Sequence, residues 1–535
     1  MKKCLWISLA ALGFVACEKG IDNDNPQNGE MEKSYVAVSL MADDMTTRAT
    51  GDVYEDGEDY ERNVKSLYFF LFDKAGNAFP IDGNKNYKSV SVNETGNAPD
   101  ANAPENEGEP NVSDVKNKVL VFENYKGEYP AKIVAVLNWT PATDAAYSLD
   151  ALATQIIGLR NAENEAFVMS NAVYVSESNS ATANKETIRA TALSAANIAK
   201  SATDAQNNPV QIYVERIAAK VTVSTTAENK YAIGEEIDGT TVYAKVTGWD
   251  LYNEYDQSYL LKKVNPNWTS TTVGFNWNDA AWFRSYWAES PTTAFTEDNK
   301  VSYNSLTNAI AGNDYCGENT YRAEGERTKV VVKALLVDEN EQPVEVATWY
   351  GNDYITKEAL LTVVANTLAS QLYYMDGEEY KSIEPNHLMV KEAFVENNPN
   401  TSAVMEAYHV FFQLSDDGKA KEWHTYSAAE GFNAATDEDI DVILGGVEPA
   451  LLYKGGQTYY YTDIKHLPST VADTQYGVVR NHVYKVNIGS ITGFGTPVYN
   501  GNTKFDPEEP AEITTYVSAE VRVLSWRVVD HNYDL

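Results

Sequence analysis

The sequence predicts a mainly β protein: two β-sandwich domains with a few short helices, followed by an extended strand at the C-terminus. Short runs rich in Val, Thr and the 35 Tyr residues alternate with turns of Asn, Gly and Asp, which is typical of strands joined by loops. Apolar residues recur at helical spacing in Ser148–Leu159 and Thr356–Leu368. No period of about 20–50 residues is present, which argues against solenoids and propellers.

The first residues indicate export. An apolar run, Leu5–Val15, follows two lysines and ends at small residues, so residues 1–16 are predicted to be a signal peptide. The segment Phe14-Val15-Ala16-Cys17 resembles a bacterial lipobox, and the polar stretch after it suits a tether between a lipid and a folded domain. We therefore predict lipidation at Cys17. The alternative is an ordinary signal peptide with a chance cysteine.

Apolar patterns predict the strands in order. Ser34–Met41 alternates apolar and polar residues as a first strand, whereas the nearly continuous apolar run Val64–Asp73 is typical of a central strand buried on both faces. Val210–Val223 predicts a strand pair and is the preferred domain boundary region. Asn97–Asp114 is predicted to be a loop, and Glu177–Asn208 a loop or weak helix. Further strands are predicted at Lys118–Phe122, Ala131–Trp139, Val330–Val337, Val404–Leu414, Gln457–Thr462 and Tyr476–Ile488.

The C-terminus predicts one long strand, Thr514–Asp530, after a spacer rich in Pro and acidic residues. Ordinary strands run about 3–10 residues, so this one is long enough for two sheets, and a slip in its apolar phase predicts a bulge or bend. Such a strand can pair with its own domain or with a neighbouring chain. We expect it to be loosely held before any assembly. Its apolar face comprises Val517, Ala519, Val521 and Val523 and, after the slip, Leu524, Trp526 and Val528.

Composition and spacing argue against several functions. The net charge of −35 makes nucleic acid an unexpected partner, because binding phosphates needs basic surface. The six His residues lack metal-ligand spacing, and Asp437–Asp441 lacks the glycine of an EF-hand loop, so this segment is predicted to be a solvated acidic loop. No nucleophile elbow, phosphate-binding loop or dinucleotide motif occurs, and Cys316 is expected to be an inert structural residue. We predict no catalytic residue, cofactor or metal, and therefore no enzyme.

Several motifs occur in a shared order that points to a family. The chain resembles the fimbrillins of Bacteroidales type V pili over nearly its full length, with the greatest likeness to shaft subunits of the minor, Mfa-type fimbriae. The motifs are the lipobox at Cys17, the first strand followed by Arg48 and Ala49, Ala131–Trp139, Phe167–Ser170, Val214–Val221, Arg480–Ile488 and Val521–Leu535.

The resemblance implies an assembly mechanism. The precursor is a lipoprotein anchored to the outer membrane, and an Arg-specific protease cuts between Arg48 and Ala49, which removes Cys17 and the first strand. The C-terminal strand of one subunit then fills the vacated groove of the next. A head-to-tail contact of this kind does not close on itself, so it builds a filament. The implied donor residues are those of the C-terminal apolar face, Val517 to Val528.

The implied organisation is a signal peptide (1–16), a lipidated propeptide with the removable strand (17–48), two transthyretin-like β-sandwich domains (49–222 and 223–500), an acidic spacer (501–512) and a donor strand (513–535). The implied location is a fimbrium on the cell surface that supports adhesion and biofilm formation. The implied partners are other copies of the chain, anchor and tip pilins, the protease, and host or bacterial surface receptors. One alternative stays open: a surface lipoprotein that binds a glycan or protein and does not polymerise. A hydrolase on the same fold is supported by no motif.

Overall fold

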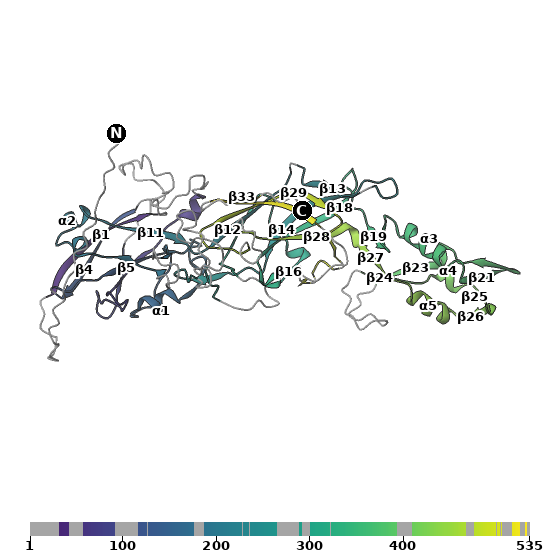
Figure 1. Cartoon of the computed structure of the whole chain (residues 1–535), viewed down its shortest axis with the longest axis horizontal. Coiled ribbons are helices and arrows are strands. Elements are labelled where there is room, and N and C mark those ends of the chain that lie inside the picture. The colour runs from purple at the N-terminus through teal and green to yellow at the C-terminus, as the bar shows by residue number, and fades with distance from the viewer. Residues whose placement is uncertain are drawn as a thin grey trace, which may run out of the picture.

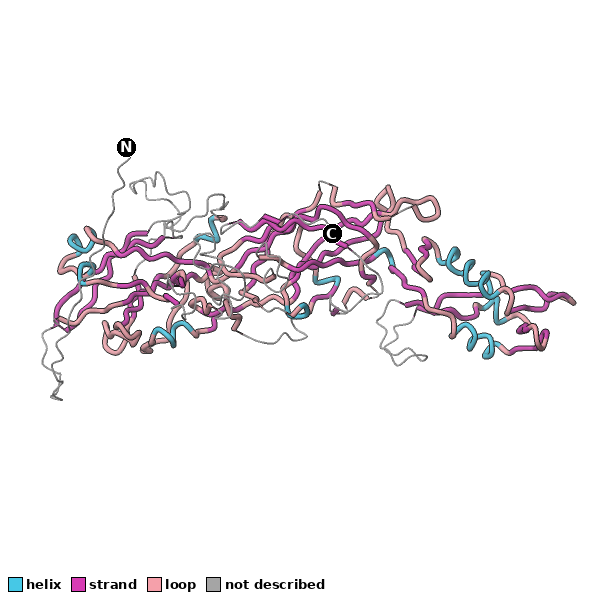
Figure 2. The backbone as a smooth tube through the Cα atoms, in the orientation of Figure 1, coloured by secondary structure: helices cyan, strands magenta, loops and turns pink. Residues whose placement is uncertain are grey.

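The computed structural model shows an elongated, mainly β molecule, as Figures 1 and 2 show. It describes residues 31–41, 57–90, 116–125, 127–175, 187–226, 228–234, 236–264, 288–291, 300–320, 323–392, 409–466, 476–498, 500–502, 504–505, 516–524 and 530–531. Over these residues an N-terminal, a central and a distal unit lie in a row. No helix in this part of the chain has the length and apolar character needed to cross a membrane. The predicted fold class, mainly β, is confirmed.

The N-terminal unit is built on a single curled sheet. Its strands, in sheet order, are β3 (Tyr87–Ser89), β2 (Leu67–Phe72), β5 (Lys132–Leu137), β7 (Met169–Asn171), β11 (Val210–Arg216), β1 (Met31–Met41) and β4 (Lys116–Tyr125), with β10 (Thr191–Ala192) beside β5. The sheet curls so far that Val36 and Val38 of β1 share a core with Phe69 of β2. Phe70 and Phe72 lie in a second core on the opposite face. The prediction that Val64–Asp73 is buried on both faces is confirmed.

The helix predicted at Ser148–Leu159 is only partly present. The helix α1 (Leu149–Ala153) begins where the Ser148 hydroxyl accepts a hydrogen bond from the Ala151 amide, which is an N-cap. It ends after one turn because the next residues form β6 (Ile156–Gly158), which pairs with β15 (Gln257–Tyr259). Tertiary pairing therefore overrides the helical spacing. The same unit contains α2 (Ala202–Gln206), β8 (Tyr174–Val175) and β9 (Thr187–Ile188).

The central unit is a β-sandwich. One sheet has the order β17 (Asn313–Cys316), β12 (Ala219–Ser224), β29 (Val483–Thr492), β32 (Tyr516–Leu524) and β33 (Asp530–His531). The other has the order β13 (Lys230–Ala232), β14 (Tyr243–Tyr252), β18 (Lys329–Val337), β28 (Gln457–Asp463) and β30 (Thr496–Pro497), and β16 (Val301–Ser302) pairs separately with β31 (Lys504–Phe505). Val221 and Val486 of the first sheet share a core with Val330 and Tyr460 of the second. This face-to-face packing defines the sandwich.

The predicted strand pair Val210–Val223 is present as β11 and β12, which belong to different sheets. The chain therefore passes from the N-terminal to the central unit between Arg216 and Ala219. The strand predicted at Tyr476–Ile488 begins later, at Val483, because Gly477 and Asn481 adopt positive φ values of 142° and 58°. Such backbone conformations interrupt an extended strand.

The distal unit is formed between two neighbouring strands of the central unit. The strands β18 and β28 pair with each other, yet the residues between them form a further core. One sheet has the order β20 (Asn352–Tyr354), β19 (Val346–Trp349), β27 (Ala450–Tyr453), β24 (His409–Leu414) and β23 (Leu388–Glu392). The other has the order β22 (Glu379–Ser382), β21 (Leu372–Asp376), β25 (Trp423–Ser427) and β26 (Gly431–Ala435). No sequence pattern marks this unit as a separate domain.

Helices complete the distal unit, as Figure 1 shows: α3 (Lys357–Leu368), α4 (Asp416–Lys419) and α5 (Asp437–Gly445). The helix predicted at Thr356–Leu368 is confirmed by α3. The prediction that Asp437–Asp441 is a solvated loop is wrong, because these residues form the first turn of α5. Thr436 caps this helix, and carboxylates are favourable beside the unpaired amides of a helix N-terminus. The 3-10 helices are η1 (Asp59–Arg62), η2 (Ala195–Asn197), η7 (Tyr303–Ser305), η8 (Glu324–Glu326), η9 (Pro385–His387) and η10 (Lys454–Gly456).

Candidate functional site

The first strand, β1, lies inside the N-terminal sheet and not at its edge. It pairs in parallel with β11, from Val38 opposite Val210 to Met41 opposite Tyr213. On its other side it pairs antiparallel with β4 along ten residues, Met31 to Leu40. Among the described strands, β4 has no other partner in this sheet. Removal of β1 would therefore leave two unpaired strand edges facing each other.

The side chains of β1 are also part of the core. Val36 and Val38 are completely buried, Leu40 is 3% exposed, and all three belong to the same apolar cluster as β2 and β5. Burying three such side chains contributes about 5–9 kcal/mol in gross terms, at about 1.5–3 kcal/mol each. Loss of β1 would thus open an apolar groove together with the two strand edges. Arg48 and Ala49, at the predicted cleavage position, lie outside the described residues, as does Cys17.

The C-terminal strand, β32, pairs antiparallel with β29 of the same chain, from Tyr516 opposite Thr492 to Leu524 opposite Val483. The strand that the sequence analysis expects to be loose before assembly is thus paired within its own chain in this conformation. Its predicted apolar positions, Val517, Ala519, Val521 and Val523, stand opposite Ile491, Ile488, Val486 and Tyr484, which all belong to the central core. The predicted donor residues of β32 are thus in register with buried apolar residues of β29.

The region predicted as one long strand contains two. The short strand β33 pairs antiparallel with β32, with His531 opposite Val521 and Asp530 opposite Arg522, so the chain reverses direction. The register is unbroken through Val523 and Leu524, where the sequence predicts a bend. A register shift occurs instead in the partner strand β29, between Ile488 and Ser490. Trp526 and Val528 lie outside the described residues.

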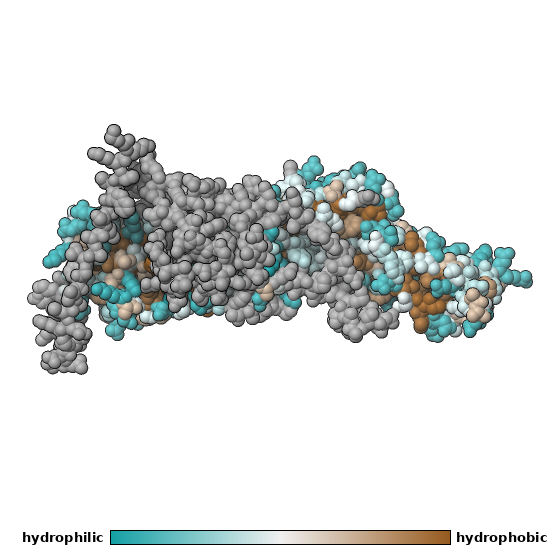
Figure 3. All heavy atoms as spheres, in the orientation of Figure 1, coloured by the Kyte–Doolittle hydropathy of each residue, from teal (hydrophilic) through white to brown (hydrophobic). Residues whose placement is uncertain are grey.

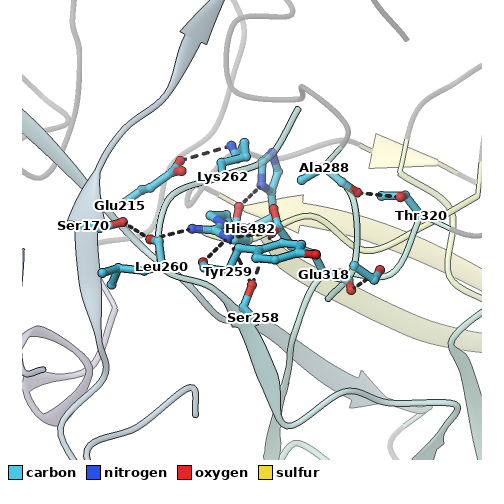
Figure 4. A network of polar contacts seen from close by, with 12 residues as sticks. Ser170, Glu215, Ser258, Tyr259, Leu260, Lys262, Ala288, Glu318, Thr320 and His482 are labelled. Carbon is cyan, nitrogen blue, oxygen red and sulfur yellow. Dashed lines mark hydrogen bonds and ion pairs between the residues drawn. The ribbon is translucent and has the colours of Figure 1, made fainter. Parts of the chain in front are cut away.

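A network of buried polar side chains joins the N-terminal and central units (Figure 4). The Arg480 guanidinium donates hydrogen bonds to Glu318 Oε2 and to the Tyr259 carbonyl, each at 2.7 Å, and Arg480 and Glu318 are both completely buried. Across the junction, Ser170 Oγ of β7 donates to the Leu260 carbonyl at 2.5 Å. The network fixes the loop after β15 between the two units.

Two further ion pairs cross the same junction. Lys262 Nζ lies 3.1 Å from Glu215 Oε2 of β11, and burial raises the pKa of the Glu215 carboxyl. Lys220 Nζ of β12 lies 2.8 Å from Glu61 Oε1 of η1. Burial alone would raise the pKa of Glu61, but hydrogen bonds from Lys220 and Tyr315 and the charge of Lys220 together lower it. Glu61 thereby ties the segment that follows the predicted cleavage position to the central unit.

Sequence reasoning found the segment containing Arg480 only as a motif and missed its role at the junction. Glu318, 162 residues away in sequence, gave no signal of its own. Cys316 is buried in β17, and burial raises the pKa of its thiol, which agrees with the expected structural role. Among the described residues, no group of three or more His, Cys, Asp or Glu side chains could hold a metal ion.

One family model matches the C-terminal part of the chain. Residues 451–532, which include β28, β29, β32 and β33, match the family model described as "Major fimbrial subunit protein type IV, Fimbrillin, C-terminal". The C-terminal region is thus similar to the C-terminal region of fimbrillins, which supports the predicted family.

Solved structures with similarity include fimbrial and adhesion proteins. A fimbrilin from Porphyromonas gingivalis W83 is 13% identical, with 92% of this chain and 98% of that chain covered and a TM-score of 0.36. A putative cell adhesion protein from Parabacteroides distasonis ATCC 8503 is 14% identical, with 91% and 96% covered and a TM-score of 0.35. The tip fimbrial protein Mfa3 from Porphyromonas gingivalis, with a C-terminal truncation, is 13% identical, with 91% and 99% covered and a TM-score of 0.27. No curated protein sequence matches the chain.

Proposed function

We propose that the protein is a fimbrial shaft subunit that is exported as a lipoprotein on Cys17, cleaved after Arg48 and polymerised by exchange of its C-terminal strand. The observation that carries the proposal is the place of β1, paired on both sides within the N-terminal sheet. Arg48 follows the end of this strand by seven residues. A cut there would release β1 from the rest of the chain without breaking any other described strand.

The C-terminal strand is the proposed replacement for β1. Its residues Val517, Ala519, Val521 and Val523 repeat the two-residue apolar spacing of Val36, Val38 and Leu40. An extended strand that joins a sheet gains main-chain hydrogen bonds, and its alternate side chains fill the apolar groove. Because donor and acceptor lie on different units, each subunit can accept from one neighbour and donate to the next, which builds an open filament. Anchor and tip pilins would terminate the two ends.

Two variants test the proposal. Arg48→Ala should yield a lipidated monomer that retains β1, and deletion of residues 513–535 should yield folded subunits that accept a strand but cannot donate one. Non-boiled gel electrophoresis measures polymerisation, because the wild-type protein should give a ladder. Arg62→Ala serves as the matched control for loss of an arginine. Ladders of normal yield from Arg48→Ala would refute processing as the trigger, and ladders from the truncated chain would refute the C-terminal donor.

A second candidate function, glycan binding, is favoured by aromatic side chains on the distal unit. On one face of the sheet β22-β21-β25-β26, Tyr380 and Phe432 stack at a centroid distance of 3.9 Å, and Tyr426 lies 4.9 Å from Phe432. These three rings are 43%, 39% and 42% exposed, respectively. Figure 3 shows apolar residues reaching the surface over the distal unit on the face in view. Electron-rich ring faces attract the polarised C–H groups of a sugar.

Glycan binding is tested separately from polymerisation. A glycan array probed with the wild-type protein and with a Tyr380→Ala, Tyr426→Ala variant should give signals for the wild type alone. Tyr461→Ala, which removes an exposed tyrosine from the central unit, is the matched control. Equal signals from both variants, or no signal from the wild type, would refute this second function and leave the assembly proposal untouched.

A further inference from the structure

We infer that a cleft between the central and distal units binds the side chain of an arginine presented by a protein partner. The cleft has a volume of about 510 Å³, which lies within the range of about 300–1,000 Å³ found for specific ligand sites. Its walls include Tyr350, Asp353 and Glu448 of the distal unit and Phe494 of the central unit. It involves neither β1 nor β32, so the inference stands independently of the proposed strand exchange.

The first observation is the strained position of Tyr350. Tyr350 and Gly351 form the two-residue turn between β19 and β20, with positive φ values of 46° and 73°. Turns of this kind strongly favour Asn, Asp or Gly at both positions, and a bulky residue there is an outlier. The Tyr350 side chain is nevertheless 68% exposed at the edge of the cleft, and its ring lies 4.8 Å from that of Trp349. An aromatic ring held at such a position is a candidate for recognition.

The second observation is the charge of the cleft. Asp353 and Glu448 both line it, and its described lining includes no Lys or Arg. Thr348 Oγ1 donates a hydrogen bond to Asp353 Oδ1 at 2.6 Å, which orients this carboxylate, and burial raises its pKa. The Glu448 backbone is fixed by a hydrogen bond from Trp349 Nε1 to its carbonyl at 2.7 Å. His409 also lines the cleft, but two carboxylates with no Lys or Arg in the described lining favour a cationic occupant.

The combination of rings and carboxylates selects arginine among cations. A guanidinium is planar, so it can stack on a face of Tyr350 or Phe494 while its N–H groups reach Asp353 or Glu448. A lysine ammonium is a more strongly hydrated point charge and stacks less well. The cleft is open to solvent, and a free small cation would keep much of its hydration there. When the arginine belongs to a partner protein, other parts of that protein can contact the exposed Tyr350 as well. These additional contacts favour a protein over a free small cation as the ligand.

The test uses the full-length protein and saturation-transfer difference NMR, which detects weak ligands of a large protein. The probe is the peptide acetyl-Gly-Arg-Gly-amide at mildly alkaline pH, above the usual titration range of an unperturbed histidine side chain. The matched probe replaces arginine with citrulline, which has the same shape and no charge. We expect the arginine peptide to bind at least about tenfold more tightly than the citrulline and lysine peptides.

Single substitutions separate the role of the ring from that of the carboxylate. Tyr350→Gly removes the ring while relaxing the turn, so it should raise the melting temperature and weaken arginine binding at least about tenfold. Asp353→Asn should weaken binding similarly, whereas Tyr461→Ala and Asp376→Asn, which lie outside the cleft, should leave it unchanged. Equal binding of arginine and citrulline peptides, or full binding by both cleft variants, would overturn the inference. Binding of free spermidine as tight as that of the peptide would overturn the assignment to a protein partner.

Discussion

Replacing Arg480 with Ala should destabilise the junction between the N-terminal and central units severely. The guanidinium is completely buried and contacts Glu318 Oε2 at 2.7 Å, Tyr259 O at 2.7 Å, Ser258 Oγ at 3.1 Å and Leu260 O at 3.3 Å. Its removal leaves the completely buried carboxylate of Glu318 without its counter-charge, and breaking such a pair costs about 3–5 kcal/mol. The loss should appear as a lower midpoint of urea unfolding, followed by tryptophan fluorescence, with little change in slope.

Two further variants separate charge from packing. Arg480→Met combined with Glu318→Gln removes both charges and keeps much of the volume, so it should recover most of the lost stability, because the penalty comes from the unpaired charge. Arg189→Ala removes an exposed pair with Asp150 at 2.8 Å and should cost less than about 1 kcal/mol. A loss below about 1 kcal/mol for Arg480→Ala, or an equal loss for the double variant, would refute the view that a buried charge pair holds this junction.

Four further predictions follow from individual groups. Burial raises the pKa of Asp250 to about 7 and that of Glu254 to about 8, so the native state binds more protons than the unfolded state and the melting temperature should rise as pH falls from about 8 to about 6; Asp250→Asn should flatten this rise, and a fall would contradict the assignment. Cys316 should react with a thiol reagent only after unfolding in urea, since it is completely buried, and fast reaction of the native protein would contradict its burial. Gly456→Ala should lower stability by more than about 1 kcal/mol, because φ is +73° and a Cβ would stand 2.6 Å from the Leu336 carbonyl oxygen; Gly377→Ala, with φ of +67° and open space, should cost less. Replacement of residues 347–452 by Asn-Gly should leave a protein that still unfolds cooperatively in urea, because Val346 and Tyr453 are opposite each other in paired strands and a two-residue turn can join them; a broad transition without cooperativity would contradict this.

The sequence predicted elements whose signal is local. The run Val64–Asp73 lies between two cores because nearly every residue in it is apolar, and α3 follows the helical spacing of Leu360, Val364 and Leu368. Ser148–Leu159 has helical spacing too, but Ile156–Gly158 gain a strand partner about 100 residues away in β15. The local sequence pattern carries no information about such a distant strand partner. The helix is therefore shorter than its sequence alone predicts.

The distal unit and the junction were missed for the same physical reason. Nothing in the alternation of β18 or β28 shows that the chain leaves one strand, builds a separate core and returns to pair beside it. The pairing of Arg480 with Glu318 likewise depends on the fold that brings them together. The C-terminal residues show the same limit. Their apolar alternation predicts a strand at β32, but it does not predict the partner of that strand, β29 of the same chain, because tertiary structure determines the pairing.

The pairing of β1 and β32 gives the proposed exchange a direction. On its own chain β32 pairs with β29 along its whole length but with β33 only at Val521 and Arg522. The place of β1 offers pairing with β4 along ten residues and with β11 along four. Under the proposed assembly, a C-terminal strand that takes the place of β1 replaces its pairing with β29 by a similarly long pairing with β4. It also gains hydrogen bonds to β11, and each added hydrogen bond contributes a net stabilisation of about 0.5–1.5 kcal/mol.

The stabilisation by these added hydrogen bonds cannot drive the exchange while β1 is covalently attached to the chain. A covalently attached strand competes at a high effective concentration, whereas a donor from another subunit must also meet an association cost of about 4–15 kcal/mol. A cut at Arg48 would turn β1 into a separate peptide, which is lost by dilution once it leaves the sheet. The groove that β1 leaves is then free for the C-terminal strand of a neighbouring subunit. Cleavage, in this proposal, does not strengthen the donor; it removes the competitor, and that alone is sufficient to make polymerisation proceed in one direction.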